Sequence, residues 1–130
     1  MSPENTKNLF DRFKFFHPEK SLRESLMSFG FEHDDGWFKI IWNLCEKIES
    51  LAKDTFEVLQ VKEKFGTLRF YTSSSTNEIE KFIDEAEELS SKTCELCGQE
   101  GSLHTSGGWL KTLCSKCATE SGRYVKEENL

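Results

Sequence analysis

The sequence has no long hydrophobic run. No stretch approaches the roughly 18 consecutive apolar residues that a membrane-spanning helix needs. The first ten residues, MSPENTKNLF, lack the basic and then apolar pattern of a secretory signal. We therefore expect no membrane association and a location in the cytoplasm.

An excess of positive charge is also missing. The chain has 17 basic and 23 acidic side chains, a net charge of −6. Residues 1–91 hold 12 basic and 18 acidic side chains, while residues 92–130 hold five of each. This balance argues against a protein that grips nucleic acid mainly by neutralising phosphates, although a local basic patch can exist on an acidic chain.

The usual signatures of catalysis are absent as well. The sequence has no glycine-rich phosphate loop, and His17, His33 and His104 are scattered singly. No Ser/His/Asp grouping can be identified from spacing. The sequence thus nominates no nucleophile.

What is present is the composition of a folded protein. Hydrophobic residues make up 36% of the chain and charged residues 31%, with eleven phenylalanines. A chain of 130 residues can form one hydrophobic core, or one core and a small additional module that a metal ion stabilises.

Apolar periodicity predicts four helices. They are expected over residues 5–16, 21–29, 37–53 and 77–89. Asp34 or Asp35 is expected to cap the third helix, because a carboxylate there can accept free backbone N–H groups. Cys45 lies in the apolar stripe of that helix and is expected in the core.

Residues 56–72 alternate with period two around a Gly-Thr pair and predict a β-hairpin. A turn at residues 66–67 sets Lys64 opposite Arg69 and Lys62 opposite Tyr71. The four side chains then share one face, and the like charges of Lys64 and Arg69 repel each other. A bound anion or a nearby carboxylate would relieve that repulsion, so this face is the leading candidate for ligand binding. An ordinary solvent-exposed strand surface is the alternative.

Two CxxC pairs lie near the C-terminus. Sixteen residues separate Cys94 and Cys97 from Cys114 and Cys117, a spacing typical of a four-thiolate zinc site. Four thiolates close a tetrahedron and leave no position for a substrate, which indicates a structural Zn²⁺. The order of knuckle, strand and helix predicts a treble-clef-like module, with His104 as an exposed hairpin residue that could replace one cysteine.

The loop before the third helix concentrates other metal-ligand types. Glu32, His33, Asp34 and Asp35 follow one another there. A second metal ion could bind them, and helix capping is the simpler interpretation.

Four short strings stand out, namely DGW at 35–37, VKEKFGTLRFY at 61–71, CELCG at 94–98 and GGWLKTLC at 107–114. Together they resemble a group of small proteins encoded by bacteriophages and prophages. The resemblance covers roughly residues 29–118 and implies a phage source and a bacterial cytoplasm, but no reaction. The functional candidates that it nominates map onto the shared hairpin string and are Lys62, Glu63, Lys64, Gly66, Arg69 and Tyr71. Asp35 and Trp37 are further candidates for ligand binding.

The expected fold is α+β. Residues 1–90 should form a β-hairpin or small antiparallel sheet packed on amphipathic helices, and residues 91–130 a four-cysteine zinc module. The leading functional hypothesis is a non-catalytic phage accessory protein that binds a host protein or a phosphate-bearing small molecule, for example in counter-defence. The alternatives are a nucleic-acid-binding zinc module and a metal-dependent nucleotide or phosphodiester hydrolase that uses Glu32, Asp34 and Asp35. The sequence leaves the oligomeric state open.

Overall fold

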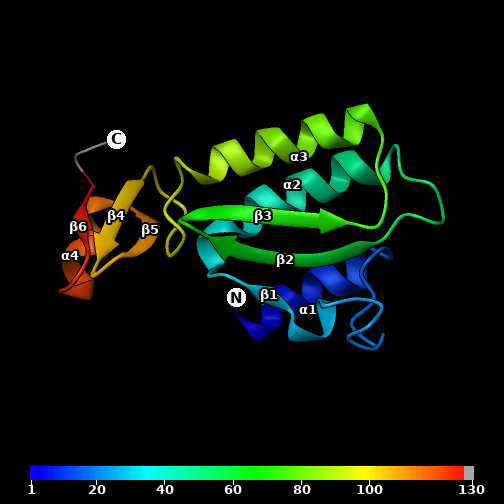
Figure 1. Cartoon of the computed structure of the whole chain (residues 1–130), viewed down its shortest axis with the longest axis horizontal. Coiled ribbons are helices and arrows are strands. Elements are labelled where there is room, and N and C mark those ends of the chain that lie inside the picture. The colour runs from blue at the N-terminus through cyan, green and yellow to red at the C-terminus, as the bar shows by residue number, and fades with distance from the viewer. Residues whose placement is uncertain (128–130) are drawn as a thin grey trace.

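A computed structural model describes residues 1–127 of the chain. Helices and strands are interspersed along these residues (Figure 1). They are α1 (Pro3–Arg12), η1 (Met27–Phe29), β1 (Phe31–Glu32), η2 (Asp35–Trp37), α2 (Phe38–Glu49), β2 (Val58–Lys64), β3 (Thr67–Thr72), α3 (Asn77–Ser90), β4 (Ser102–Ser106), β5 (Trp109–Leu113), α4 (Ser115–Ser121) and β6 (Val125–Lys126). The predicted α+β class is confirmed.

The larger part of the molecule is built on a three-stranded sheet. The strand order is β1-β2-β3, with β1 parallel and β3 antiparallel to β2. In Figure 1, α2 lies behind this sheet and α3 runs along β3. One face of the sheet is therefore covered by helices, and no helix lies in front of the other face in this view.

The predicted turn of the hairpin is displaced by one residue, so each predicted cross-strand pair is wrong by two residues. Phe65 and Gly66 form the two-residue turn with φ of 55° and 86°, so Lys64 pairs with Thr67 and Lys62 pairs with Arg69. Two positive φ values are the signature of a type I′ turn, which matches the twist of the flanking strands. The turn predicted at residues 66–67 required a positive φ at Gly66 only.

The corrected register keeps the basic residues on one face and changes the other. Val61, Leu68 and Phe70 are buried against the helices, as expected. Phe65 leaves this apolar face, because it now lies in the turn with 66% of its surface exposed. Glu63 takes its place on the inner face, opposite Leu68, and its Oε2 accepts a hydrogen bond of 2.7 Å from the turn N–H of Gly66.

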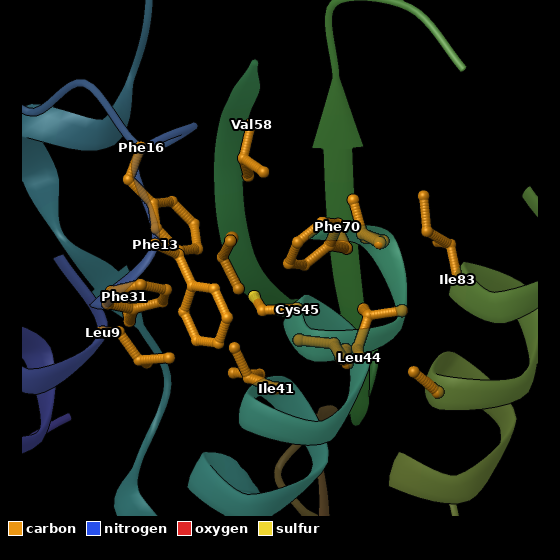
Figure 2. Packing of buried hydrophobic residues seen from close by; sticks show 14 of the residues in the cluster. Leu9, Phe13, Phe16, Phe31, Ile41, Leu44, Cys45, Val58, Phe70 and Ile83 are labelled. Carbon is orange, nitrogen blue, oxygen red and sulfur yellow. The ribbon is translucent and has the colours of Figure 1, made fainter. Parts of the chain in front are cut away.

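One hydrophobic core joins α1, the sheet, α2 and α3. Figure 2 shows aromatic side chains from the N-terminal segment meeting the stripe of α2, with β2, β3 and α3 beyond it. The sulfur of Cys45 points into this cluster, and its residue is fully buried, so the predicted core position is confirmed. The labelled members are Leu9, Phe13, Phe16, Phe31, Ile41, Leu44, Cys45, Val58, Phe70 and Ile83.

Three of the predicted helices are shorter in the structure. The first ends at Arg12, because Phe13 adopts an extended conformation and its chain turns toward the sheet. The segment 21–29 forms only the short 3-10 turn η1 instead of a helix. The third begins at Phe38 and ends at Glu49, after a 3-10 turn that the apolar periodicity did not separate from it.

The free edge of β3 is closed by side chains of α3. The buried hydroxyl of Ser90 accepts a 2.9 Å hydrogen bond from the N–H of Leu68, and Glu87 accepts a 3.1 Å hydrogen bond from the N–H of Phe70. An uncovered strand edge is a template for pairing with other chains. Here a helix supplies the missing acceptors.

The C-terminal part is a separate small sheet with a helix. Its strand order is β5-β4-β6, and β4 and β5 form a hairpin. The first cysteine pair precedes this hairpin, and α4 begins directly after Cys114. This sequence of knuckle, hairpin and helix is that of a treble clef, as predicted. No helix within residues 1–127 is long and apolar enough to cross a membrane.

Candidate metal centre and open sheet face

The four paired cysteines come together at one point of the C-terminal module. The Sγ atoms of Cys94, Cys97, Cys114 and Cys117 all lie within 4.8 Å of one another. Within residues 1–127 they are the only group of three or more His, Cys, Asp or Glu side chains with this geometry. Residues that the sequence separates by sixteen positions are thus joined by the fold.

Local backbone geometry positions each pair. Gly98 ends the knuckle with φ of 82°, which lets its N–H donate a 2.9 Å hydrogen bond to the carbonyl of Cys94. The second pair stands at the start of α4, where the N–H of Cys117 donates to Sγ of Cys114 at 3.4 Å. This backbone hydrogen bond is the main cause that lowers the pKa of Cys114 to about 7. Such a thiol reaches the thiolate form, which binds metal, near neutral pH.

The distances fit a metal ion. Two sulfurs at opposite ends of a tetrahedral edge lie about 3.8 Å apart when each is about 2.3 Å from a zinc ion. Sγ of Cys97 and Sγ of Cys114 are 3.6 Å apart. Four adjacent thiolates repel one another without a cation, so this donor set suits a soft or borderline divalent metal in a closed, structural site.

His104 does not belong to this cluster. It lies on β4 and is only 5% exposed, and its Nδ1 is 2.8 Å from the carbonyl oxygen of Ser102. The expectation of an exposed hairpin residue is therefore wrong. The pairing of β4 with β6, which sets Lys126 beside His104, was not visible in the sequence.

Gly36 brings the main domain against the knuckle. Its N–H donates a 2.7 Å hydrogen bond to the carbonyl of Glu95, and a Cβ at this position would lie 2.1 Å from the carbonyl oxygen of Cys94. Only a residue without a side chain permits this approach. Beside it, the indole N–H of Trp37 donates to the carbonyl of Thr93 at 2.9 Å.

The hairpin turn makes a second contact with the module. The hydroxyl of Thr112 donates a 2.6 Å hydrogen bond to the carbonyl of Gly66, and a Cβ on Gly66 would lie 2.6 Å from Cδ1 of Leu103. The turn therefore needs glycine for two reasons, its positive φ and this close packing.

A buried polar cluster lies between these contacts. Glu95 is only 2% exposed, and its Oε2 accepts a 3.1 Å hydrogen bond from the N–H of Asp34. Burial raises the pKa of Glu95 to about 7, against the opposing effect of Lys111. Nζ of Lys111 lies 3.3 Å from Asp34 and 3.9 Å from Glu95 and bridges the two acids. We call the contacts of Gly36, Gly66 and this cluster the junction.

The loop at 32–35 does not form a second metal site. Its side chains point to different partners: Glu32 accepts from Gln60, and Asp34 pairs with Lys111. His33 is buried, and desolvation lowers its pKa to about 4. Its Nδ1 lies 2.8 Å from the carbonyl of Asp34, and its Nε2 has no partner within residues 1–127.

Asp35 and Trp37 have structural roles. Asp35 accepts hydrogen bonds from the N–H of Ser2 at 2.9 Å and from the side chain of Asn5 at 3.0 Å, and the first of these is the main cause of its lowered pKa. Asp35 therefore holds the N-terminal segment in place. The prediction that Asp34 or Asp35 caps the helix is wrong, because neither side chain makes a capping hydrogen bond to η2 or α2. Trp37 is fully buried, so it is not available to a ligand.

The four remaining candidates share the open face of the sheet. Lys62, Lys64, Arg69 and Tyr71 all lie on the side of the hairpin opposite the buried residues. Within residues 1–127 the three cations form no ion pair, and Nε of Arg69 is buried without a hydrogen-bond partner. Glu32 is the neighbour of Lys62 on β1, but its carboxylate is engaged by Gln60.

The four strings quoted above meet at the junction. DGW and CELCG contact each other through Gly36, and the hairpin turn contacts the segment before Cys114 through Thr112. Sequence reasoning missed Glu95, Lys111 and Thr112 as members of this contact. The sequence signal that could have identified them is that all three lie inside the shared strings CELCG and GGWLKTLC.

Comparison with protein-family models, with curated proteins and with solved structures finds no match.

Proposed function

We propose that this chain is a non-catalytic binding protein, stabilised by one structural zinc ion, whose open sheet face takes up a phosphate-bearing ligand. The resemblance to phage and prophage proteins makes the cytoplasm of a bacterial host the proposed setting. Zinc is the proposed metal because a closed set of four thiolates is its usual structural site.

The observation that carries the proposal is the pairing of Lys62 with Arg69. Like charges directly opposite each other on a strand pair cost roughly 0.2–1 kcal/mol. No carboxylate within residues 1–127 forms an ion pair with either side chain, and Glu87 attracts Arg69 only at a distance beyond that of an ion pair. Lys64 adds a third cation, and an anion bound among them would offset the repulsion.

The fold also supports the open face as the binding site, because it gives a structural role to some residues of the shared hairpin string and not to others. In the shared hairpin string, Gly66 and Glu63 have evident structural roles in the turn. Lys62, Lys64, Arg69 and Tyr71 make no side-chain hydrogen bond within residues 1–127, although Glu87 attracts Arg69. Side chains without a hydrogen-bond partner in the fold can take one from a ligand.

The test is a titration of the zinc-loaded protein with pyrophosphate, followed by two-dimensional NMR of the backbone amides. We expect chemical-shift changes concentrated in β2 and β3. Reversing charge with Lys62→Glu and Lys64→Glu should abolish them, while Lys81→Glu on the exposed surface of α3 makes the matched charge change and should leave them intact. Equal loss in the Lys81→Glu control, or no shifts on the face at all, would sink the proposal.

A further inference from the structure

Phe65 breaks a local rule that the rest of the hairpin obeys. It holds the left-handed conformation at φ of 55°, where Asn, Asp or Gly are the favoured residues of a type I′ turn. A bulky residue there is an outlier. Its side chain is 66% exposed, so burial in the core does not explain its presence.

The ring of Phe65 lies beside the cations of the open face. Nζ of Lys64 is 5.5 Å from the ring centroid. At the other end of the same face Tyr71 is 44% exposed and pairs with Gln60. Along the hairpin the order is an exposed aromatic ring, three cations and a second exposed aromatic ring, over about 17 Å at 3.4 Å per residue.

Aromatic rings that alternate with cations on an open surface are the features that bind single-stranded nucleic acid. Bases stack on the rings while Lys and Arg meet the phosphates, and the binding does not depend on sequence. We infer that the ligand of the open face is single-stranded nucleic acid, with Phe65 and Tyr71 as stacking platforms and Lys62, Lys64 and Arg69 as phosphate contacts. This inference rests on the proposed function and names its ligand class.

The shape of the face agrees with an extended ligand. Two cavities, of about 800 and 540 Å³, are lined by residues of the helices and the knuckle, and none of the face residues lines either of them. An enclosed small molecule would need such a hollow. A row of cations and rings along two strands suits a chain that lies across it.

The charge of the whole protein limits the strength of binding. The net charge is −6, and the acidic surface of α3 lies beside the sheet. With three phosphate contacts, the logarithm of the affinity should fall against the logarithm of salt concentration with a slope of about −2. Binding is therefore to be measured first at low salt.

The experiment is fluorescence anisotropy of zinc-loaded protein with labelled oligomers of about 12 nucleotides. Oligo-dT and oligo-U form two arms that separate DNA from RNA, and unlabelled duplex DNA serves as a competitor. Phe65→Asn places a residue that favours the left-handed turn, so its melting temperature should be unchanged or higher. Its affinity for the oligomers should fall about 5- to 100-fold.

Two further variants complete the design. Tyr71→Ser should weaken binding in the same way, and Phe29→Ala removes an exposed ring outside the strands and should leave the affinity unchanged. Phe65→Asn should also keep its pyrophosphate-induced NMR shifts, since the cations remain.

The outcomes separate the two proposals. Pyrophosphate binding without oligomer binding, or oligomer binding that Phe65→Asn and Tyr71→Ser leave unchanged, overturns this inference and leaves the proposed function standing. Failure of both ligands overturns both proposals.

Discussion

At the scale of single residues, Gly36 is the position with the least freedom. Its backbone touches the carbonyl groups of Cys94 and Glu95, where an added Cβ would lie 2.1 and 2.4 Å from the two oxygens. Backbone atoms cannot move aside as a flexible side chain can. The close approach fixes how the main domain meets the knuckle.

We therefore predict that Gly36→Ala lowers the free energy of unfolding by about 3 kcal/mol, because it forces the junction apart. Chemical denaturation at neutral pH with excess zinc measures the change. Gly107→Ala is the control: nothing lies within 4 Å of its added Cβ, and only its φ of 55° is unfavourable. It should cost about 1 kcal/mol. Equal losses in the two variants would show that crowding at Gly36 is not the cause.

At the scale of elements, the contact between α3 and β3 replaces a missing fourth strand. Ser90 is fully buried and gives its hydroxyl oxygen to the N–H of Leu68, while the hydroxyl itself donates to the carbonyl of Glu87. A single hydroxyl thus joins the last turn of the helix to the edge of the sheet.

Ser90→Ala should destabilise the protein by about 1–3 kcal/mol, because it leaves the buried N–H of Leu68 without an acceptor. Hydrogen exchange should speed up first at the amide of Leu68. The neighbouring Ser91→Ala removes a hydroxyl that donates a hydrogen bond only to the carbonyl of Glu88 at the end of the same helix, and it should change stability by less than about 0.5 kcal/mol. Unchanged exchange at Leu68 in Ser90→Ala would contradict the role of this contact.

At the scale of the whole molecule, the structure has two hydrophobic clusters of very different size. The large cluster spans Leu9 to Ala86, whereas the buried members of the small one are Cys94, Leu113 and Ala118. So small a cluster cannot balance the entropy lost on ordering the module's chain. A metal ion held by the four cysteines should supply the missing free energy.

Removal of zinc with a chelator at neutral pH should unfold the module and leave the large core folded. Hydrogen exchange followed by mass spectrometry should show loss of protection from residue 94 onward and retained protection in β2, β3 and α2. Cys114→Ser should reproduce this loss, and Ser115→Ala, its exposed neighbour, should not. Native mass spectrometry should count one zinc per chain before chelation. A module that stays protected without metal would disprove the dependence.

Much of the fold could be predicted from the sequence by local chemistry. The stripe of α2 and α3, the existence of the hairpin and the core position of Cys45 follow from periodicity, because side chains at i, i+3 and i+4 share a helix face and alternate side chains share a strand face. The four metal ligands follow from spacing, since two CxxC turns can each supply one edge of a tetrahedron. These features depend on residues close together in the chain.

The tertiary structure decided the rest. The turn lies at Phe65 and Gly66 because the glycine must pack on Leu103 and Thr112, which are remote in sequence, and this contact displaces the turn by one residue and the cross-strand pairing by two. The ligand-type side chains of the loop at 32–35 are separated because Asp34 is drawn to Lys111 and Asp35 to the N-terminus. The sequence determined the helical stripes of α2 and α3, the presence of the hairpin and which cysteines can hold a metal. Long-range packing determined which side chains are buried or hydrogen-bonded within the fold and which remain exposed on the open face. Burial and hydrogen bonding of this kind depend on contacts between segments that are distant in the sequence.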